Sequence, residues 1–352
     1  MINRTLLRLC LVVPVVLVLI SLPLLFEPRR RSFNCRSFWS CISGPSSYNE
    51  DVAAPLKGSG DLKADVSEAT LPDGTVRFTR RNPAHTPSTL VLVLTRDAGS
   101  WSHDYHSTQR SVYDFLDLLA STKLALPNVA VGILTASADE FKAIQKATEG
   151  VPLGRVTILQ RNDTGSSFEY GDRHKPDIQD ERRALLARLR NYLMNGALQD
   201  ESHIFWVDAD VVEFSEGIVQ TMLKHAESRA DVGILTARCE RDTLYNYDMN
   251  AWKVAPAELD AANATDRVAL QDKLEHSKTW VPELMKDTSN EDLVPLDSVG
   301  GTLLYMRAEL VRQGLIFPWW SAVGTGWERE GMEGGGCFVL GGSHKTRHAD
   351  QG

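Results

Sequence analysis

Long apolar runs alternate with segments of helical periodicity in the chain from residue 89 onward. Three runs are rich in β-branched residues and poor in charge, which is typical of strands buried on both faces: Thr89–Thr95, Val129–Thr135 and Arg155–Gln160. Three segments repeat apolar residues every three to four positions and predict helices: Gln109–Ser121, Asp139–Thr148 and Gln179–Asn195. The alternation predicts an α/β domain in which helices cover both faces of a mostly parallel, Rossmann-like sheet.

A further apolar run, Ser202–Phe214, reads SHIFWVDADVVEF and is interrupted by Asp208 and Asp210. Because an apolar environment disfavours unpaired carboxylates, we expect these two side chains to lie at the end of a buried strand. Ligands of parallel sheets bind beyond the carboxyl ends of the strands, and carboxylate oxygens bind hard divalent cations. The pattern predicts a metal site that could hold the phosphates of a nucleotide; the alternative is an ordinary polar strand end.

The predicted helix before this strand is rich in arginine, with the sequence DERRALLARLRNYL. Arg183 and Arg190 are seven residues apart, so they share one helical face two turns along. A basic face beside an acidic strand end could bind a diphosphate. The alternative is a charged face in contact with solvent.

The N-terminal part of the chain has no such alternation. Leu9–Phe26 is apolar and uncharged, which predicts an uncleaved transmembrane signal-anchor (residues 9–26) after a cytosolic tail of residues 1–8. The alternative is a cleaved signal peptide, although no clear small-x-small cleavage site follows. Residues 27–88 are rich in proline, glycine and serine and predict a stem, so residues 89–352 are expected to form a lumenal catalytic domain.

Composition and modification signals add little to this organisation. A net charge of −8 argues against a general nucleic-acid-binding protein, so no nucleic-acid partner is expected. Asn162 and Asn263 begin N-glycosylation sequons, which agree with a lumenal domain. Cys35 and Cys41 in the stem could pair with each other or join two chains.

Five motifs occur in a characteristic order: RRALLARLRN, FWVDADVVE, YNYDMNAW, DSVGGTLLYMRAELVRQGLIFP and WEREG. This set resembles the fungal Golgi mannan-polymerase mannosyltransferases, glycosyltransferase family sixty-two. The resemblance implies a GT-A fold behind a type II Golgi membrane anchor, GDP-mannose as donor and Mn²⁺ as cofactor. It also implies transfer of mannose with retention to a mannan or N-glycan outer-chain acceptor, within a hetero-oligomer of related subunits.

The resemblance further implies roles for individual residues. It assigns metal binding to Asp208, Asp210 and His348. It assigns the donor site to Thr95, Arg183, Arg190, Asn191, Asp208, Tyr247, Gly300 and Gly301, the glycines because a sugar can approach bare backbone closely. It assigns catalysis or acceptor binding to Asp248, Asp297, Glu328 and Glu330.

The C-terminal region departs from the family pattern, because Gly334, Gly335 and Gly336 stand where the family has a helix. Because the resemblance implies membrane-bound heteromers, a non-catalytic subunit that scaffolds related transferases is an alternative function. A second alternative, a metal-dependent hydrolase, would need a second metal-binding acid, and Glu213 is the nearby candidate. The linkage formed, the acceptor length and the chemical route to retention remain open.

Overall fold

A computed structural model describes residues 64–162, 176–240, 250–254, 276–286, 288, 292–318, 320–322 and 332–334, with backbone alone for residues 176–180, 320–322 and 332–334. All of them belong to one compact unit, Ala53–Gly352. The strands are β1 (Asp65–Thr70), β2 (Val76–Arg81), β3 (Thr89–Leu94), β4 (Val129–Thr135), β5 (Arg155–Gln160), β6 (His203–Val207), β7 (Ile234–Thr236), β8 (Trp252–Val254), β9 (Lys278–Trp280), β10 (Leu303–Arg307), β11 (Trp320–Ala322) and β12 (Met332–Gly334). The helices are α3 (Val112–Ser121), α4 (Ala138–Thr148), α5 (Pro176–Ala197), α6 (Ile218–Ser228), α9 (Val281–Leu284) and α10 (Ala308–Arg312), with 3-10 turns η1 (Ala98–Trp101) and η2 (Leu126–Asn128).

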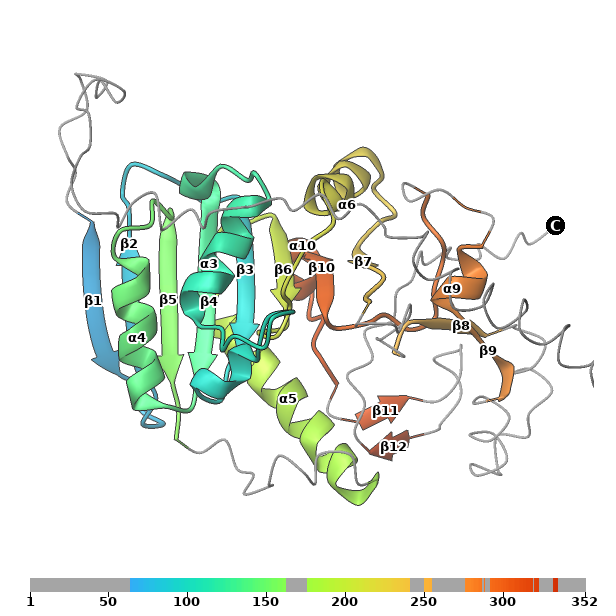
Figure 1. Cartoon of the computed structure of the whole chain (residues 1–352), viewed down its shortest axis with the longest axis horizontal. Coiled ribbons are helices and arrows are strands. Elements are labelled where there is room, and N and C mark those ends of the chain that lie inside the picture. Colours follow the sequence, from blue (N-terminus) through green and yellow to red (C-terminus); the bar gives the residue numbers. More distant parts are fainter. Residues whose placement is uncertain are drawn as a thin grey trace, which may run out of the picture. The chain divides into compact units, whose positions relative to one another are not determined.

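Eight strands form the central sheet in the order β1-β2-β5-β4-β3-β6-β10-β7 (Figure 1). The four strands β5, β4, β3 and β6 are parallel to one another, as the buried apolar runs predicted. β2 pairs antiparallel with β5, and β10 pairs antiparallel with both β6 and β7. The sheet is therefore mixed, and the prediction of a mostly parallel sheet holds for its centre alone.

β1 and β2 correct the predicted stem, because both strands lie within residues 27–88 and yet belong to the sheet. All six residues of β1 are exposed, and in β2 the one fully buried side chain is that of Phe78. An exposed, polar edge strand has no apolar run to reveal it in the sequence. The folded domain therefore begins before Thr89.

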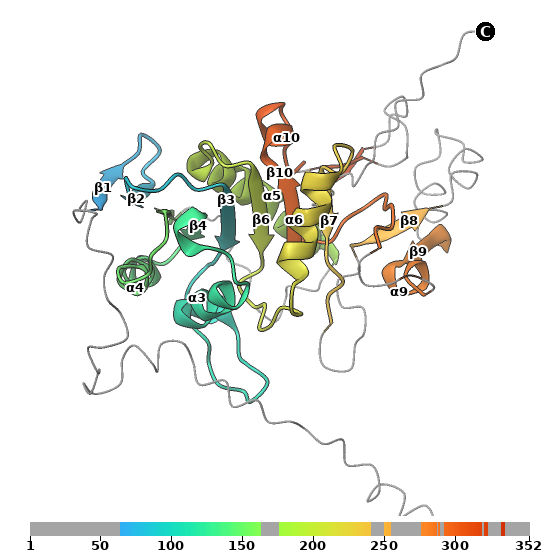
Figure 2. The ribbon, with the colours of Figure 1, turned by 90° about the horizontal axis from the view of Figure 1, so that it is seen from above.

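Helices cover both faces of the sheet (Figure 2). On one face, α5 packs over β3 and β4, and Gly132 allows close approach, since a Cβ there would lie 2.9 Å from the Ala197 Cβ. On the other face, Val91 and Phe205 meet Phe115 of α3 and Val219 of α6 around a small cavity. The sheet is thus buried between two helical layers, as the apolar strands predicted.

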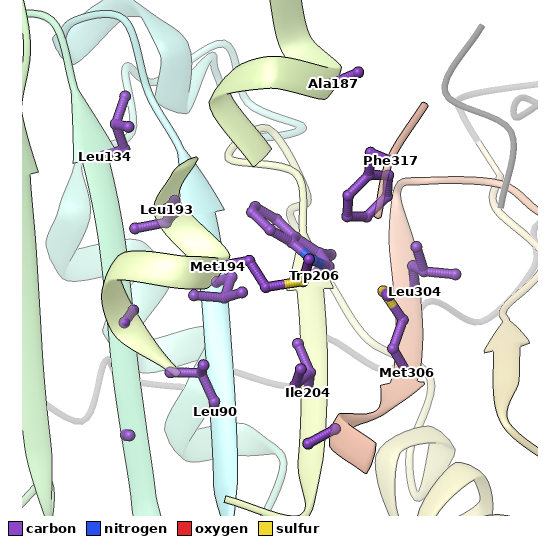
Figure 3. Packing of buried hydrophobic residues seen from close by; sticks show 14 of the residues in the cluster. Leu90, Leu134, Ala187, Leu193, Met194, Ile204, Trp206, Leu304, Met306 and Phe317 are labelled. Atoms are coloured by element: carbon purple, nitrogen blue, oxygen red, sulfur yellow. The ribbon is translucent and has the colours of Figure 1, made fainter. Parts of the chain in front are cut away.

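The core next to the acidic strand end is built around Trp206 (Figure 3). Trp206 and Phe317 are almost completely buried and meet edge to face, with ring centroids 5.6 Å apart and an interplanar angle of 88°. Met194 of α5 and Leu304 of β10 belong to the same cluster. Each large apolar side chain buried here stabilises the fold by about 1.5–3 kcal/mol, so the cluster fixes α5 against β6.

The boundary of α3 differs from its prediction for a local reason. The helix begins at Val112 because the Ser111 hydroxyl accepts a hydrogen bond from the Tyr113 amide while Asp114 accepts one from the Ser111 amide. The predicted start at Gln109 was therefore too early.

No helix in the described ranges is long and apolar enough to cross a membrane, and the predicted anchor, residues 9–26, lies outside those ranges.

Candidate functional site

Asp208, Ala209 and Asp210 form a turn directly after β6, at the carboxyl end of the parallel strands, as predicted. The Asp208 amide donates a hydrogen bond to the Thr302 carbonyl (3.0 Å), and the Val211 amide donates one to the Asp208 carbonyl (3.1 Å). The turn is therefore tied to the chain that leads into β10. This is the edge of the sheet at which an α/β fold places its ligand.

Arg190 of α5 reaches this turn from one face of the sheet. Its Nη2 atom lies 3.1 Å from Oδ1 of Asp208 and 3.4 Å from the Gly301 carbonyl oxygen. The guanidinium carbon stands 5.5 Å from the ring centroid of Trp206 and 5.3 Å from that of Phe317. The Arg190 side chain is 9% exposed, so the prediction of a basic face beside the acidic strand end is confirmed for this residue. Arg183, two turns earlier, is exposed.

Gly301 gives Arg190 the space it occupies. A Cβ added at Gly301 would lie 2.8 Å from Nη1 and 3.0 Å from Nη2 of Arg190, closer than ordinary contact. Gly300 is buried beside it, and its carbonyl accepts a hydrogen bond from the Thr236 hydroxyl (3.2 Å). The absence of a side chain at Gly301 therefore allows an arginine to approach closely, whereas the family resemblance suggested close approach of a sugar.

A second buried arginine, Arg110, reaches the same turn and was missed by the sequence reasoning. Its Nη1 atom donates to the carbonyl oxygens of Trp101 (3.0 Å) and Ala209 (3.3 Å). Burial lowers the pKa of the Arg110 guanidinium, while the negative charges of Asp114 and Asp210 act in the opposite direction. The acceptor at the turn is a backbone carbonyl in a distant segment, so no residue pattern in the sequence could have revealed the contact.

Asp210 is exposed and lines a cavity of about 1350 Å³. The walls come from α6, α9, the loop before α3 and the segments on either side of β7, including Tyr105, Glu213 and Met285. This volume exceeds that of a typical small-molecule site, which is roughly 300–1,000 Å³. The cavity is therefore large enough for an extended ligand that ends beside Asp210.

The metal prediction rests on two carboxylates within the described residues. No three Asp, Glu, His or Cys side chains gather there around a common point, so Glu213 does not complete such a group with Asp208 and Asp210. Two carboxylates are compatible with a hard cation that takes its remaining ligands from a diphosphate. The third predicted ligand, His348, lies outside the described residues.

Three other predicted site residues bind backbone groups of other segments. The Asn191 amide nitrogen donates to the Phe317 carbonyl (2.7 Å), and its oxygen accepts from the Phe317 amide (2.8 Å). Asp297 accepts a hydrogen bond from the Val254 amide (2.8 Å), and the Thr95 hydroxyl donates to the Leu134 carbonyl (3.3 Å). Four more predicted residues lie outside the described ranges: Tyr247, Asp248, Glu328 and Glu330.

Comparison with known proteins finds a family match over most of the folded region. The model of the Anp1 family matches residues 77–321. The "Mannan polymerase complex subunit mnn9" of Schizosaccharomyces pombe is 32% identical over 190 residues, which are 51% of this chain and 54% of that protein. The "Mannan polymerase II complex ANP1 subunit" of Saccharomyces cerevisiae is 33% identical over 179 residues, 47% of this chain and 35% of that protein. The chain thus spans about half or less of the length of these relatives.

Among solved structures, the chain is similar to Staphylococcus aureus TarS in complex with UDP. The TM-score is 0.34 at 13% identity, over 66% of this chain and 50% of TarS.

Proposed function

Because the chain belongs to the Anp1 family, we propose that it is a metal-dependent α-mannosyltransferase that acts as a subunit of a mannan polymerase complex. The donor in this proposal is GDP-mannose, and the acceptor is a mannose-containing glycan. The names of the relatives support the complex, and the five ordered sequence motifs support the donor and the reaction.

The observation that carries the proposal is the ion pair between the buried Arg190 and the half-exposed Asp208, beside the exposed Asp210. A structural ion pair would not need a second, exposed carboxylate two residues along, at the edge of the sheet where ligands bind. Arg190 orients the Asp208 carboxylate through a charge-assisted hydrogen bond. The two aspartates would then hold a divalent cation together with the donor diphosphate. When bound, the cation would neutralise the charge that develops on the leaving GDP.

The cavity beside Asp210 supplies a place for the acceptor glycan in this proposal. The net transfer would form a bond between an acceptor hydroxyl oxygen and C1 of mannose, break the bond between C1 and the diphosphate, and release GDP together with the hydroxyl proton. Tyr105, which is 67% exposed and lines the cavity, offers an aromatic face of the kind that stacks on sugars. We further propose a GT-A arrangement and a Golgi location behind the predicted anchor, supported by the parallel centre of the sheet and by the apolar segment Leu9–Phe26.

The test is to incubate the purified full chain with GDP-mannose, Mn²⁺ and a short α-mannoside and to determine the linkage in the product. An elongated α-mannoside that requires Mn²⁺ is the expected result. An enzymatic role would be contradicted if the folded chain showed no transfer and no hydrolysis of GDP-mannose, even after related subunits are added. Activity that appears in a partner subunit alone would instead support the scaffolding alternative.

A further inference from the structure

Arg110 is a charged residue buried beneath the turn that contains the two aspartates, with 4% of its surface exposed. We propose that Arg110 is a positioning residue for the Asp208–Asp210 turn: it fixes the Ala209 carbonyl so that both carboxylates can bind one cation. The inference rests on the proposed function, because it concerns the cation of that same site. The contact that carries it is the 3.3 Å hydrogen bond from Nη1 of Arg110 to the Ala209 oxygen.

The position of the Ala209 carbonyl controls the geometry of the whole turn. The peptide plane that contains this oxygen also contains the amide nitrogen of Asp210, and it is rigid because of its partial double bond. Holding the oxygen therefore fixes the direction in which the chain leaves Ala209 toward Asp210. Two carboxylates can share one cation at about 2–2.6 Å only if their separation is held constant.

The other end of the Arg110 contact is anchored in the core. Nη1 of Arg110 also donates to the Trp101 carbonyl at 3.0 Å. Trp101 is fully buried, packs against Phe115 at a centroid distance of 5.7 Å, and donates from its indole nitrogen to Glu140 at 2.6 Å. Arg110 therefore connects the turn to a buried part of the helical layer formed by α3 and α4, and not to a mobile loop.

Arg110 and Arg190 hold the turn from opposite faces of the sheet. Arg190 comes from α5 and binds the Asp208 side chain, whereas Arg110 precedes α3 and binds the backbone one residue later. Burying an arginine is costly because the charged guanidinium loses its hydration, and the same loss lowers the pKa of Arg110. An apolar residue would fill the same space at lower cost. A buried charge that reaches the peptide joining Ala209 to Asp210, between two candidate metal ligands, is therefore better explained by a requirement of the site than by packing.

The experiment measures binding of Mn²⁺ in the presence of GDP, and thermal unfolding without metal, for the full chain and three variants. Arg110→Met removes both hydrogen bonds at similar side-chain length, and Arg110→Lys keeps the charge without the planar fork. Arg80→Met is the matched control, because Arg80 is also partly buried and donates to two carbonyls, those of Glu149 and Val151, away from the turn.

Arg110→Met should weaken Mn²⁺ binding by about 10–100-fold, the usual effect of removing a group that orients a metal ligand. The Mn²⁺ affinity of Arg110→Lys should lie between that of Arg110→Met and that of the wild type. Arg110→Lys provides the readout if Arg110→Met does not fold. Arg80→Met should bind Mn²⁺ as the wild type does, whatever its unfolding temperature. Wild-type Mn²⁺ affinity in folded Arg110→Met would overturn this inference and leave the proposed function standing. If Arg110→Met does not fold, wild-type Mn²⁺ affinity in Arg110→Lys would have the same meaning. A wild-type chain that binds no Mn²⁺ with GDP would overturn the proposed metal site as well.

Discussion

Replacing Gly301 by alanine adds a single methyl group against the Arg190 guanidinium. The new Cβ would lie 2.8 Å from Nη1 and 3.0 Å from Nη2, whereas ordinary contacts begin at 3.4 Å, so the guanidinium must move by about 0.6 Å. It has little room to retreat, because it lies over the rings of Trp206 and Phe317 and is 9% exposed. The movement should lengthen the 3.1 Å contact with Asp208.

The cost of this substitution can be bounded from two opposing effects. Adding a methyl group to a well-packed site destabilises proteins by about 1–3 kcal/mol. Alanine also restricts the unfolded chain, which stabilises by about 0.4–1 kcal/mol where the backbone conformation allows it. Gly301 is not among the glycines with positive φ, so this second effect applies. We expect Gly301→Ala to lower the free energy of unfolding by about 1–2 kcal/mol.

A double-mutant cycle with Arg190→Met assigns that cost to the guanidinium. Each single variant and the double variant are unfolded in denaturant, and the free energies are compared with that of the wild type. Gly301→Ala should cost about 1 kcal/mol less when residue 190 is methionine, because the new Cβ then meets no guanidinium. Gly150→Ala is the control: no atom lies within 4 Å of its added Cβ, so its stability should not fall. An equal cost of Gly301→Ala in both backgrounds would refute the role given to Arg190.

Two further substitutions test the surroundings of the site. Asn191→Ala removes both hydrogen bonds to the Phe317 backbone and should lower the free energy of unfolding by about 1–3 kcal/mol, with unchanged GDP-mannose affinity of the folded chain. Weaker donor binding at full stability would instead support the donor contact implied by the family resemblance. Glu140→Gln tests a buried carboxyl whose pKa is raised above its ordinary value of 4.5 by burial, although Trp101 donates a hydrogen bond to it. Because the pKa is raised in the folded state, the wild type loses stability as the pH rises above 4.5. The free energy of unfolding should therefore decrease less with rising pH in Glu140→Gln than in the wild type. Parallel plots of this free energy against pH would contradict the reasoning.

The centre of the fold was predictable from the sequence because its signal is local. β3 and β4 are strands buried on both faces, so a run of apolar residues is enough to reveal them, and both match the prediction to within one residue. β1 is an exposed edge strand in which polar residues predominate, so it has no apolar run and the same reasoning placed it in a stem. Strand order and the antiparallel pairing of β2 and β10 depend on long-range contacts, which an apolar pattern does not encode.

The candidate site was predictable in position and less so in its internal contacts. The acid-x-acid pattern at a strand end identified Asp208 and Asp210, and the seven-residue spacing identified the face that presents Arg190. Gly301 was assigned to the site, but its neighbour there is a guanidinium, which becomes visible only when α5 and β10 are placed together. Arg110 binds backbone oxygens, and any residue type can provide these, so nothing in the sequence marks its partners.

The most direct test of the central claim is mannose transfer from GDP-mannose at limiting Mn²⁺ by the wild type and by Asp210→Asn. Asp210 is the informative position because it is exposed, whereas replacing Asp208 would also remove the ion pair with Arg190. Asp65→Asn, an equivalent change on the exposed edge strand β1, controls for the loss of one charge. If Asp210 holds the cation and the donor, transfer by Asp210→Asn falls to background at an unchanged unfolding temperature, while Asp65→Asn stays fully active. Transfer by Asp210→Asn at the wild-type rate would contradict the account.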